Sequence, residues 1–383
     1  MRISKGGVVA SKMRRLSMVV ASSAFFLVAA HHTAFSQGLP NPYRPVRGLA
    51  DGGGPFIPGS EWTARPAGSP ASMYIDVDGE SVWAFIRCDG TSPVPLAKGG
   101  RFGVDCLTED NKVKNLDTIF KFDPKGNIVK RFGRGLFIWP HGLLVDNEGN
   151  VWVTDGASPQ AVEMAAKGGV NAGHQIIKFS PDGKILMRLG EAGVAGKDET
   201  HFMSPSAVAI GANGDIFVAD GHEVNGNNRV VKLTKDGKFI KAWGATGYAP
   251  GEFRTLHAIA IDPSGRVFVA DRDNNRIQIF DQEGKHLSTW TQFGTPSGIA
   301  FDNKGQIYVA DSESDGVNNP GWEQGIRIGD LKTGFVNAFI LDPGGNPNTQ
   351  TGSGAEFVAV DKNGNIFAGE PRPRVLQKYV KVR

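Results

Sequence analysis

Six segments of this 383-residue chain repeat one pattern, and this repeat constrains the fold more than any other feature of the sequence. Each segment is an apolar strand, a turn that ends in glycine, and a second apolar strand. The turn glycines are Gly79, Gly149, Gly214, Gly265, Gly305 and Gly364. Apolar and polar residues alternate on both sides of each turn, which is typical of a β-hairpin. The chain is therefore expected to build the same hairpin six times.

A second set of hairpins lies between the first. Their first strands begin at Ile119, Ile176, Val230, Ile277 and Ile326. Two hairpins per repeat make a four-stranded sheet, and the turn glycines recur 40 to 70 residues apart. This spacing predicts an all-β fold over residues 70–383, a six-bladed β-propeller whose sheets surround a channel.

The two ends of the chain are expected to share the last blade. After Glu370 only one strand follows, from Val375 to Val382, so the sixth blade lacks an outer strand. The N-terminal segment 37–69 contains one candidate, Tyr43-Arg44-Pro45-Val46-Arg47. We expect these residues to complete the sixth blade and close the ring.

Residues 1–36 have the three parts of a secretory signal peptide. Basic residues precede an apolar stretch at 16–30, and a small-x-small cleavage motif ends at Ser36, before Gln37. The apolar stretch falls short of the roughly 18–20 strongly apolar residues of a permanent anchor. We therefore expect cleavage near Ser36 and Gln37, no membrane span, and a secreted or periplasmic protein.

Cys88 and Cys106 are the only cysteines. A pair of cysteines in an exported protein most simply forms a disulfide bond, which is the pairing we predict. A metal-binding or catalytic role is the weaker alternative, because neither cysteine has a second thiol at ligand spacing.

Charge and composition exclude several classes of protein. The net charge is +3, with 40% hydrophobic and 21% charged residues. This balance does not fit a disordered chain, a polybasic nucleic-acid binder or a polytopic membrane protein. We expect a monomer that binds no nucleic acid.

The residue that enters the first strand of each blade should lie at one mouth of the channel. In chain order these residues are Ala71, His141, Ser206, His257, Ser297 and Glu356. One such histidine alone is more often an ordinary polar surface residue, and one such glutamate a solvated acid. Ligand-type side chains in three alternate blades instead favour a metal site on the axis. Two histidines and a carboxylate with open positions suit Zn²⁺, with Fe²⁺ as the second choice.

A second ring of candidates follows the second strands of the blades. It includes Arg87, His222 and Arg272. The two arginines do not recur in other blades, and beside a metal they would hold a substrate carboxylate through two parallel hydrogen bonds. The alternative for each arginine is a surface salt bridge.

Other residues of this second ring do recur and are predicted to be structural. The recurring aspartates are Asp155, Asp220, Asp271 and Asp311. Short acidic side chains at such positions cap loops by accepting backbone hydrogen bonds. Arg229 and Arg276 belong to a repeated Asn-Arg-hydrophobic pattern and are also predicted to be structural.

Residues 70–380 resemble NHL-repeat propellers and, within these, the peptidyl-α-hydroxyglycine α-amidating lyases. The resemblance rests on the segments IWPHGLLVDNEGNVWVTD, HFMSPSAVAI, GEFRTLHAIAI and VADRDNNRIQIF, which follow the order of the family. The resemblance implies a six-bladed propeller with an axial zinc ion held by three histidines. It also implies an activity that splits an α-hydroxyglycine-extended peptide into a peptide amide and glyoxylate.

The resemblance also implies a role for each candidate residue. Zinc ligands match His141 and His257, with Glu356 at the position of the third histidine, and carboxylate-binding arginines match Arg87 and Arg272.

Two further positions depart from the pattern of the family. His222 stands where the family has its catalytic tyrosine, and a histidine there would take a proton near neutral pH. Phe357 stands where the family has an acidic residue of a structural calcium site. The resemblance therefore puts the family's calcium site in doubt in this chain.

These observations predict a secreted, metal-dependent lyase or hydrolase that acts on a small molecule or peptide bearing a carboxylate. Its metal would polarise an oxygen, His222 would take the proton, and Arg87 with Arg272 would hold the carboxylate. A non-catalytic NHL propeller that binds a protein or glycan partner is the alternative. A lactone hydrolase is a third possibility, but it would need a calcium site of acidic and Asn ligands, which this axis lacks.

Overall fold

The computed structural model describes residues 38–45, 68–88, 103–223, 225–342, 354–370 and 375–382. Residues Leu39–Arg383 form one compact unit. The predicted signal peptide, residues 1–36, lies outside the described residues, as does most of the segment 37–69. In the described part of the chain, no helix has the length and apolar character needed to cross a membrane.

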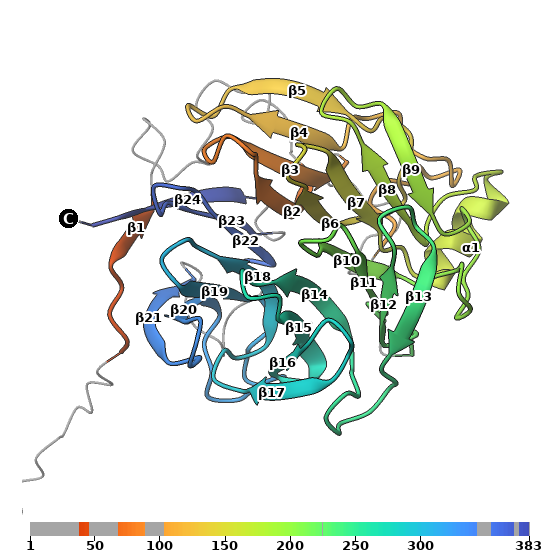
Figure 1. The fold of residues 1–383 in the computed structure, drawn as a ribbon. Helices are drawn as coiled ribbons and strands as arrows, with labels where there is room; N and C mark the ends of the chain where they lie inside the picture. Colours follow the sequence, from red (N-terminus) through yellow and green to blue (C-terminus); the bar gives the residue numbers. More distant parts are fainter. Residues whose placement is uncertain are drawn as a thin grey trace, which may run out of the picture. The chain divides into compact units, whose positions relative to one another are not determined.

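Six four-stranded antiparallel sheets make up this unit, so the predicted all-β, six-bladed propeller is confirmed (Figure 1). The strands of the first blade are β2 (Ser69–Ile75), β3 (Val82–Arg87), β4 (Ile119–Phe122) and β5 (Ile128–Phe132). Those of the second are β6 (Pro140–Val145), β7 (Val151–Asp155), β8 (Gln175–Phe179) and β9 (Ile185–Leu189). Those of the third are β10 (Pro205–Ile210), β11 (Ile216–Asp220), β12 (Arg229–Leu233) and β13 (Phe239–Trp243).

The remaining three blades repeat the same order. The strands of the fourth are β14 (Leu256–Ile261), β15 (Val267–Asp271), β16 (Arg276–Phe280) and β17 (His286–Trp290). Those of the fifth are β18 (Pro296–Phe301), β19 (Gln306–Asp311), β20 (Gly325–Asp330) and β21 (Val336–Leu341). Those of the sixth are β22 (Phe357–Val360), β23 (Ile366–Glu370), β24 (Val375–Lys381) and β1 (Tyr43–Pro45).

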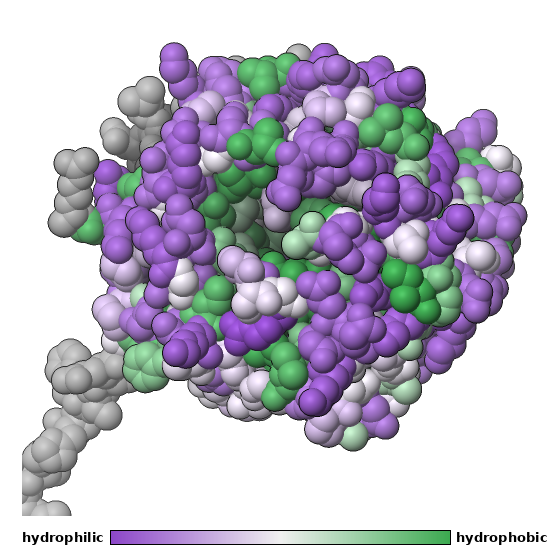
Figure 2. All heavy atoms as spheres, in the orientation of Figure 1, coloured by the Kyte–Doolittle hydropathy of each residue, from purple (hydrophilic) through white to green (hydrophobic). Residues whose placement is uncertain are grey.

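The first strand of each blade lies closest to the axis, and each of these inner strands contacts the inner strands of the two neighbouring blades (Figure 1). The last inner strand, β22, returns to contact β2, so the ring is closed. Figure 2 shows the hollow at the centre of the ring, with apolar surface in its wall.

The N-terminal strand β1 provides the outer strand of the sixth blade. It pairs antiparallel with β24, with Tyr43 opposite Lys381 and Pro45 opposite Tyr379. Tyr43 is buried in the hydrophobic cluster between the last two blades, together with Tyr379 and Tyr308. The two ends of the propeller domain are therefore held together by a shared sheet. Val46 and Arg47 of the candidate closing segment lie outside the described residues.

Strand position within a blade explains the patterns of burial. All five residues of β11 and all five of β15 are buried, because neighbouring blades cover both faces of a middle strand. Outer strands have one face in water, and β13 accordingly alternates between partly buried and exposed residues. The turn glycines Gly149 and Gly265 have φ values of 80° and 87°, a conformation that favours glycine.

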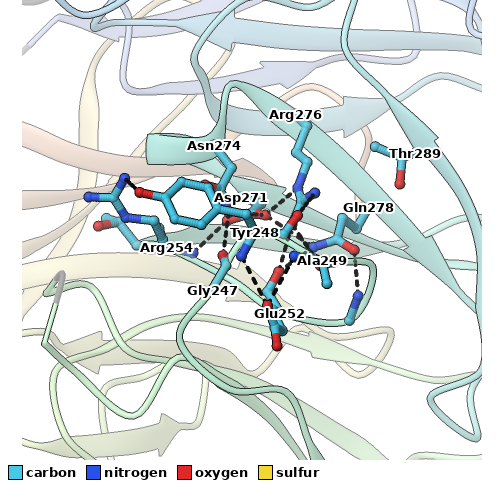
Figure 3. A network of polar contacts seen from close by, with 12 residues as sticks. Gly247, Tyr248, Ala249, Glu252, Arg254, Asp271, Asn274, Arg276, Gln278 and Thr289 are labelled. Carbon is cyan, nitrogen blue, oxygen red and sulfur yellow. Dashed lines mark hydrogen bonds and ion pairs between the residues drawn. The ribbon is translucent and has the colours of Figure 1, made fainter.

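Recurring aspartates at the ends of the second strands tie each blade to its neighbouring loops. Figure 3 shows the fourth-blade example, in which the Asp271 carboxylate accepts from the Arg254 backbone N–H (2.7 Å) and the Arg276 Nε (2.6 Å). Asn274 and Gln278 donate to the same carboxylate at 2.9 and 3.0 Å. The equivalent pairs in the third and fifth blades are Asp220–Arg229 and Asp311–Arg327. The structural roles predicted for the aspartates and for the two arginines of the Asn-Arg pattern are confirmed.

The one α-helix in the described residues, α1 (Pro159–Lys167), lies in the loop between the two hairpins of the second blade. The Ser158 side chain caps it by accepting from the Ala161 N–H at 3.2 Å, and proline occupies the first turn. The helix packs with residues from 104–113 and with Trp139 in a separate hydrophobic cluster. One member of this cluster, Trp139, also contacts the site described below.

Cys88 and Cys106 form the predicted disulfide bond, with Cα atoms 5.3 Å apart. We expect the double substitution Cys88→Ala/Cys106→Ala to lower the free energy of unfolding by about 3 kcal/mol, because the bridge closes a loop of roughly 17 residues. Urea denaturation would measure the loss, and thiol titration of the unreduced wild type should find no free thiol. Two free thiols per chain would contradict the pairing.

Candidate functional site

Three imidazoles gather at one mouth of the channel. His141 lies in β6, His257 in β14, and His222 two residues after the end of β11. One ring nitrogen from each lies within 4.8 Å of those of the other two. The ring centroids of His141 are 4.4 Å from His222 and 4.7 Å from His257, and the remaining pair is 5.1 Å apart.

Backbone carbonyls of the next blade set the tautomers of two of these rings. The Nδ1 atom of His141 lies 2.7 Å from the Ser206 carbonyl, and that of His257 lies 2.8 Å from the Ser297 carbonyl. A carbonyl oxygen only accepts hydrogen bonds, so each Nδ1 carries the proton and each Nε2 keeps its lone pair. Both Nε2 atoms, and Nδ1 of His222, are buried and have no hydrogen-bond partner among the described residues.

The close approach of neighbouring blades makes these hydrogen bonds possible. Gly142 follows His141, and a Cβ atom at this glycine would lie 2.4 Å from the Ser206 carbonyl oxygen. That oxygen also accepts from the Thr154 hydroxyl at 3.0 Å, and the same hydroxyl accepts from the Gly142 N–H at 2.8 Å. The acceptor that orients His141 is therefore itself held in place by the second blade.

All three histidines are held neutral. Burial keeps the pKa of each imidazole well below its ordinary value of 6.5. After burial, the positive charge of Arg87 is the next cause of the lowered pKa of His141, and the positive charge of Arg272 is the next cause for His257. A neutral imidazole with a free lone pair is the form that binds metal ions.

Glu356 lies at the same mouth but is engaged elsewhere. Its Oε2 accepts from Nη2 of Arg87 at 3.1 Å, and both side chains are almost fully buried. Arg87 also donates from Nε to the Pro140 carbonyl at 3.1 Å, and its guanidinium stacks 4.4 Å from the Trp139 ring centroid. The group of possible metal ligands found in the described residues contains the three histidines and not Glu356.

Arg272 begins the short 3₁₀ helix η2 (Arg272–Asn274), directly after the aspartate that ends β15. Its Nε atom is buried and has no hydrogen-bond partner among the described residues, with Oδ1 of Asp273 3.6 Å away. The two arginines therefore differ, because Arg87 donates a hydrogen bond to its acidic partner Glu356, whereas Arg272 makes none to its acidic neighbour Asp273 and retains an unused Nε–H donor.

Two aromatic residues contact the histidines although the sequence reasoning assigned neither of them this place; Phe357 was noted only as a departure from the calcium site of the family. Trp139 contacts His141 and His222, with ring centroids 5.1 and 4.9 Å apart. Phe357 packs against His141 and His257, each at 5.5 Å. The sequence did contain a signal that could have placed both residues at the site. Trp139 lies two positions before the predicted ligand His141, and Phe357 directly follows the predicted ligand Glu356.

The three histidines fit a structural or catalytic metal ion by donor type, charge and orientation. Three neutral nitrogens leave one or more coordination positions open, as in catalytic zinc sites. Hydrogen bonds on the far side of two rings hold the rings in orientation, as is common for metal-binding histidines. The site thus combines a possible cation-binding group with the unused N–H donor of Arg272.

This chain is similar both to a known repeat family and to several known proteins. The NHL repeat model matches residues 202–233, 253–280 and 293–314. A probable peptidyl-alpha-hydroxyglycine alpha-amidating lyase of Caenorhabditis elegans is 37% identical over 179 residues, which cover 46% of each chain. Peptidyl-alpha-hydroxyglycine alpha-amidating lyase 1 of Drosophila melanogaster is 31% identical over 289 residues, 69% of this chain and 48% of the relative.

A third similar protein is much longer than this chain. Peptidyl-glycine alpha-amidating monooxygenase of Mus musculus is 37% identical over 180 residues, 45% of this chain and 16% of the relative. The matched region spans less than half the length of each of these three relatives. The chain is a six-bladed β-propeller in which three segments match the NHL repeat, and its sequence resembles the peptidyl-α-hydroxyglycine α-amidating lyases.

Proposed function

We propose that this protein is a metal-dependent carbon–nitrogen lyase of the peptidyl-α-hydroxyglycine α-amidating type, acting on a small or peptide substrate with a carboxylate. The observation that supports it most is the group of three neutral imidazoles, two of them buried and that of His222 partly buried, each of which offers one ring nitrogen within 4.8 Å of the others. The similarity to chains named as lyases of this type supports the choice of reaction.

The proposed metal ligands are His141, His222 and His257, and Zn²⁺ is the proposed ion, with Fe²⁺ as the second choice. When bound there, the ion would supply Lewis acidity towards a substrate oxygen. This ligand set gives His222 a ligand role in place of the proton-accepting role expected from its position in the sequence. In this ligand set Glu356 remains the ion-pair partner of Arg87 and does not bind the metal. Breaking a buried ion pair lowers protein stability by about 3–5 kcal/mol, which favours keeping the pair intact.

Arg272 is proposed to hold the substrate carboxylate. Its unused Nε–H and its positive charge at the edge of the histidine group suit a carboxylate oxygen. In the proposed reaction the substrate hydroxyl loses its proton and becomes a carbonyl, the carbon–nitrogen bond breaks, and the nitrogen takes the electron pair and a proton. The products are then an amide and glyoxylate.

The compartment is proposed on chemical grounds. A disulfide bond persists in an oxidising environment, and residues 1–36 have the pattern of a cleaved signal peptide. We infer that the protein acts after export, as a secreted or periplasmic enzyme.

One experiment tests the proposed function. Protein purified without chelators should contain about one transition-metal ion per chain by elemental analysis and should release glyoxylate from an N-acyl-α-hydroxyglycine. The matched control is His201→Ala, which removes a histidine whose ring binds Asp198 at the surface, and it should change neither readout. A wild type that is metal-free, or metal-loaded but inert, would contradict the proposal; the inert form would favour a propeller that binds a partner.

A further inference from the structure

Unpartnered polar atoms concentrate at the site. Nine buried side-chain nitrogen and oxygen atoms have no hydrogen-bond partner in the described part of the chain. Five of them belong to the site: Trp139 Nε1, His141 Nε2, His222 Nδ1, His257 Nε2 and Arg272 Nε. Buried polar groups are rarely left unpaired, since an unmade hydrogen bond costs about 1–3 kcal/mol. A ligand that satisfies these atoms is therefore expected.

These atoms divide into two chemical kinds. The histidine nitrogens are proposed above to bind a cation, whereas an indole or guanidinium N–H only donates. The Nε1–H of Trp139 and the Nε–H of Arg272 thus require an acceptor, and neither a metal ion nor a cationic group provides one. An anionic oxygen of a ligand is the acceptor that fits beside a metal ion.

Trp139 is held rigidly in place. Its backbone N–H donates to Oδ1 of Asp155 at 2.9 Å, and its carbonyl accepts from the Gly156 N–H at 3.1 Å. The indole contacts the Arg87 guanidinium and the rings of His141 and His222, and it also belongs to the buried cluster around α1. The indole N–H is the only polar group of this residue that has no partner among the described residues.

The other tryptophans provide a comparison. Trp83 and Trp152 donate from Nε1 to Asp76 and Asp146, at 2.9 and 3.0 Å. Trp243 also has an unpartnered Nε1, but it lies in the outer strand β13 between Phe217 and Phe280, away from the histidines. Trp139 is thus distinguished by its place beside the histidines, and Trp243 is a matched control for the same chemical change.

We propose that Trp139 is a substrate-contacting residue that sets specificity: its indole N–H donates to a carboxylate oxygen of the ligand, alongside Arg272. The ligand class is a small carboxylate with an oxygen on the adjacent carbon, such as glyoxylate. The identity of this ligand rests on the proposed function. A neutral donor on a rigid ring adds direction to the charge supplied by arginine, so it would favour carboxylates that present an oxygen to both donors.

The test uses full-length, zinc-loaded protein and glyoxylate as the probe. The wild type labelled with ¹⁵N at its seven tryptophan indoles should show one N–H resonance that moves downfield as glyoxylate is added. Trp139→Phe should remove that resonance and weaken glyoxylate binding about tenfold by calorimetry, because a hydrogen bond to a charged acceptor is lost. Trp243→Phe should remove a different resonance and leave the affinity unchanged. The zinc content of both variants should equal that of the wild type.

The outcomes separate this inference from the proposed function. Suppose that the wild type binds glyoxylate and also produces it from an N-acyl-α-hydroxyglycine. If the Trp139 resonance then stays still and Trp139→Phe binds glyoxylate equally well, the role of Trp139 is wrong and the lyase proposal stands. Because the resonance is followed in the wild type, this result does not depend on how the variant folds. If the wild type neither binds nor produces glyoxylate, the proposed function fails and the role of Trp139 fails with it.

Discussion

Each of the three single substitutions His141→Ala, His222→Ala and His257→Ala should reduce the bound metal from about one ion per chain to a trace. The physical reason is that each substitution removes one of three nitrogens, leaving too few donors for a tight site. Removing even the outer hydrogen-bond partners of such ligands costs about 10–100-fold in metal affinity or activity, so direct removal should exceed about 100-fold. Elemental analysis and glyoxylate release would measure the two losses.

Two comparisons make this result specific. Glu356→Gln should retain the metal, because the Glu356 carboxylate binds Arg87 and is not among the grouped ligand atoms. The packed blades should keep every histidine variant folded, as judged by the circular dichroism spectrum and thermal unfolding. Full metal content in His222→Ala, with loss in Glu356→Gln, would instead establish the ligand set of the sequence resemblance and return His222 to a proton-accepting role.

Lysine in place of Arg272 should lower kcat/KM about 10- to 100-fold while leaving the metal content unchanged. An ammonium keeps the positive charge but cannot present the two parallel donors of a guanidinium to a carboxylate, and a hydrogen bond to a charged group contributes about 1.5–3 kcal/mol. Steady-state release of glyoxylate from an N-acyl-α-hydroxyglycine would measure the change.

Arg266→Lys is the matched control for this substitution. Arg266 lies in the turn at the opposite end of β15, where it pairs with Asp262, so the same chemical change occurs in the same blade far from the site. We expect it to leave kcat/KM as in the wild type. Equal activity of Arg272→Lys and wild type would show that Arg272 does not hold the substrate carboxylate. Arg87 would then be the remaining arginine at this mouth.

The ion pair between Arg87 and Glu356 is a feature that separates this chain from the pattern its sequence resembles. Where the resemblance implies a histidine at the position of Glu356, this chain has a carboxylate, and that carboxylate occupies an arginine that was expected to bind substrate. The two changes are coupled, since a buried carboxylate and a buried guanidinium each require an opposite charge. Arg272 therefore becomes the main candidate for substrate binding.

The repeated hairpins made the architecture predictable from sequence alone. Hairpin patterns are local, because alternation at period two and a glycine in the turn specify two neighbouring strands without reference to the rest of the chain. Six repeats then leave few arrangements that bury both faces of every sheet. The same equivalence of blades placed His141 and His257 at matching positions, and the structure brings their rings together.

The site itself depended on contacts that no local pattern contains. His222 lies in a loop after a strand, and its position in the sequence did not show that its ring would meet the rings of His141 and His257. Arg87 and Glu356 are 269 residues apart and meet because the sixth blade closes against the first. The indole of Trp139 belongs to the cluster around α1 and also lies against the rings of His141 and His222. Sequence thus determined the blades, because their pattern is short-range, whereas ring closure and loop packing decided which side chains share the axis.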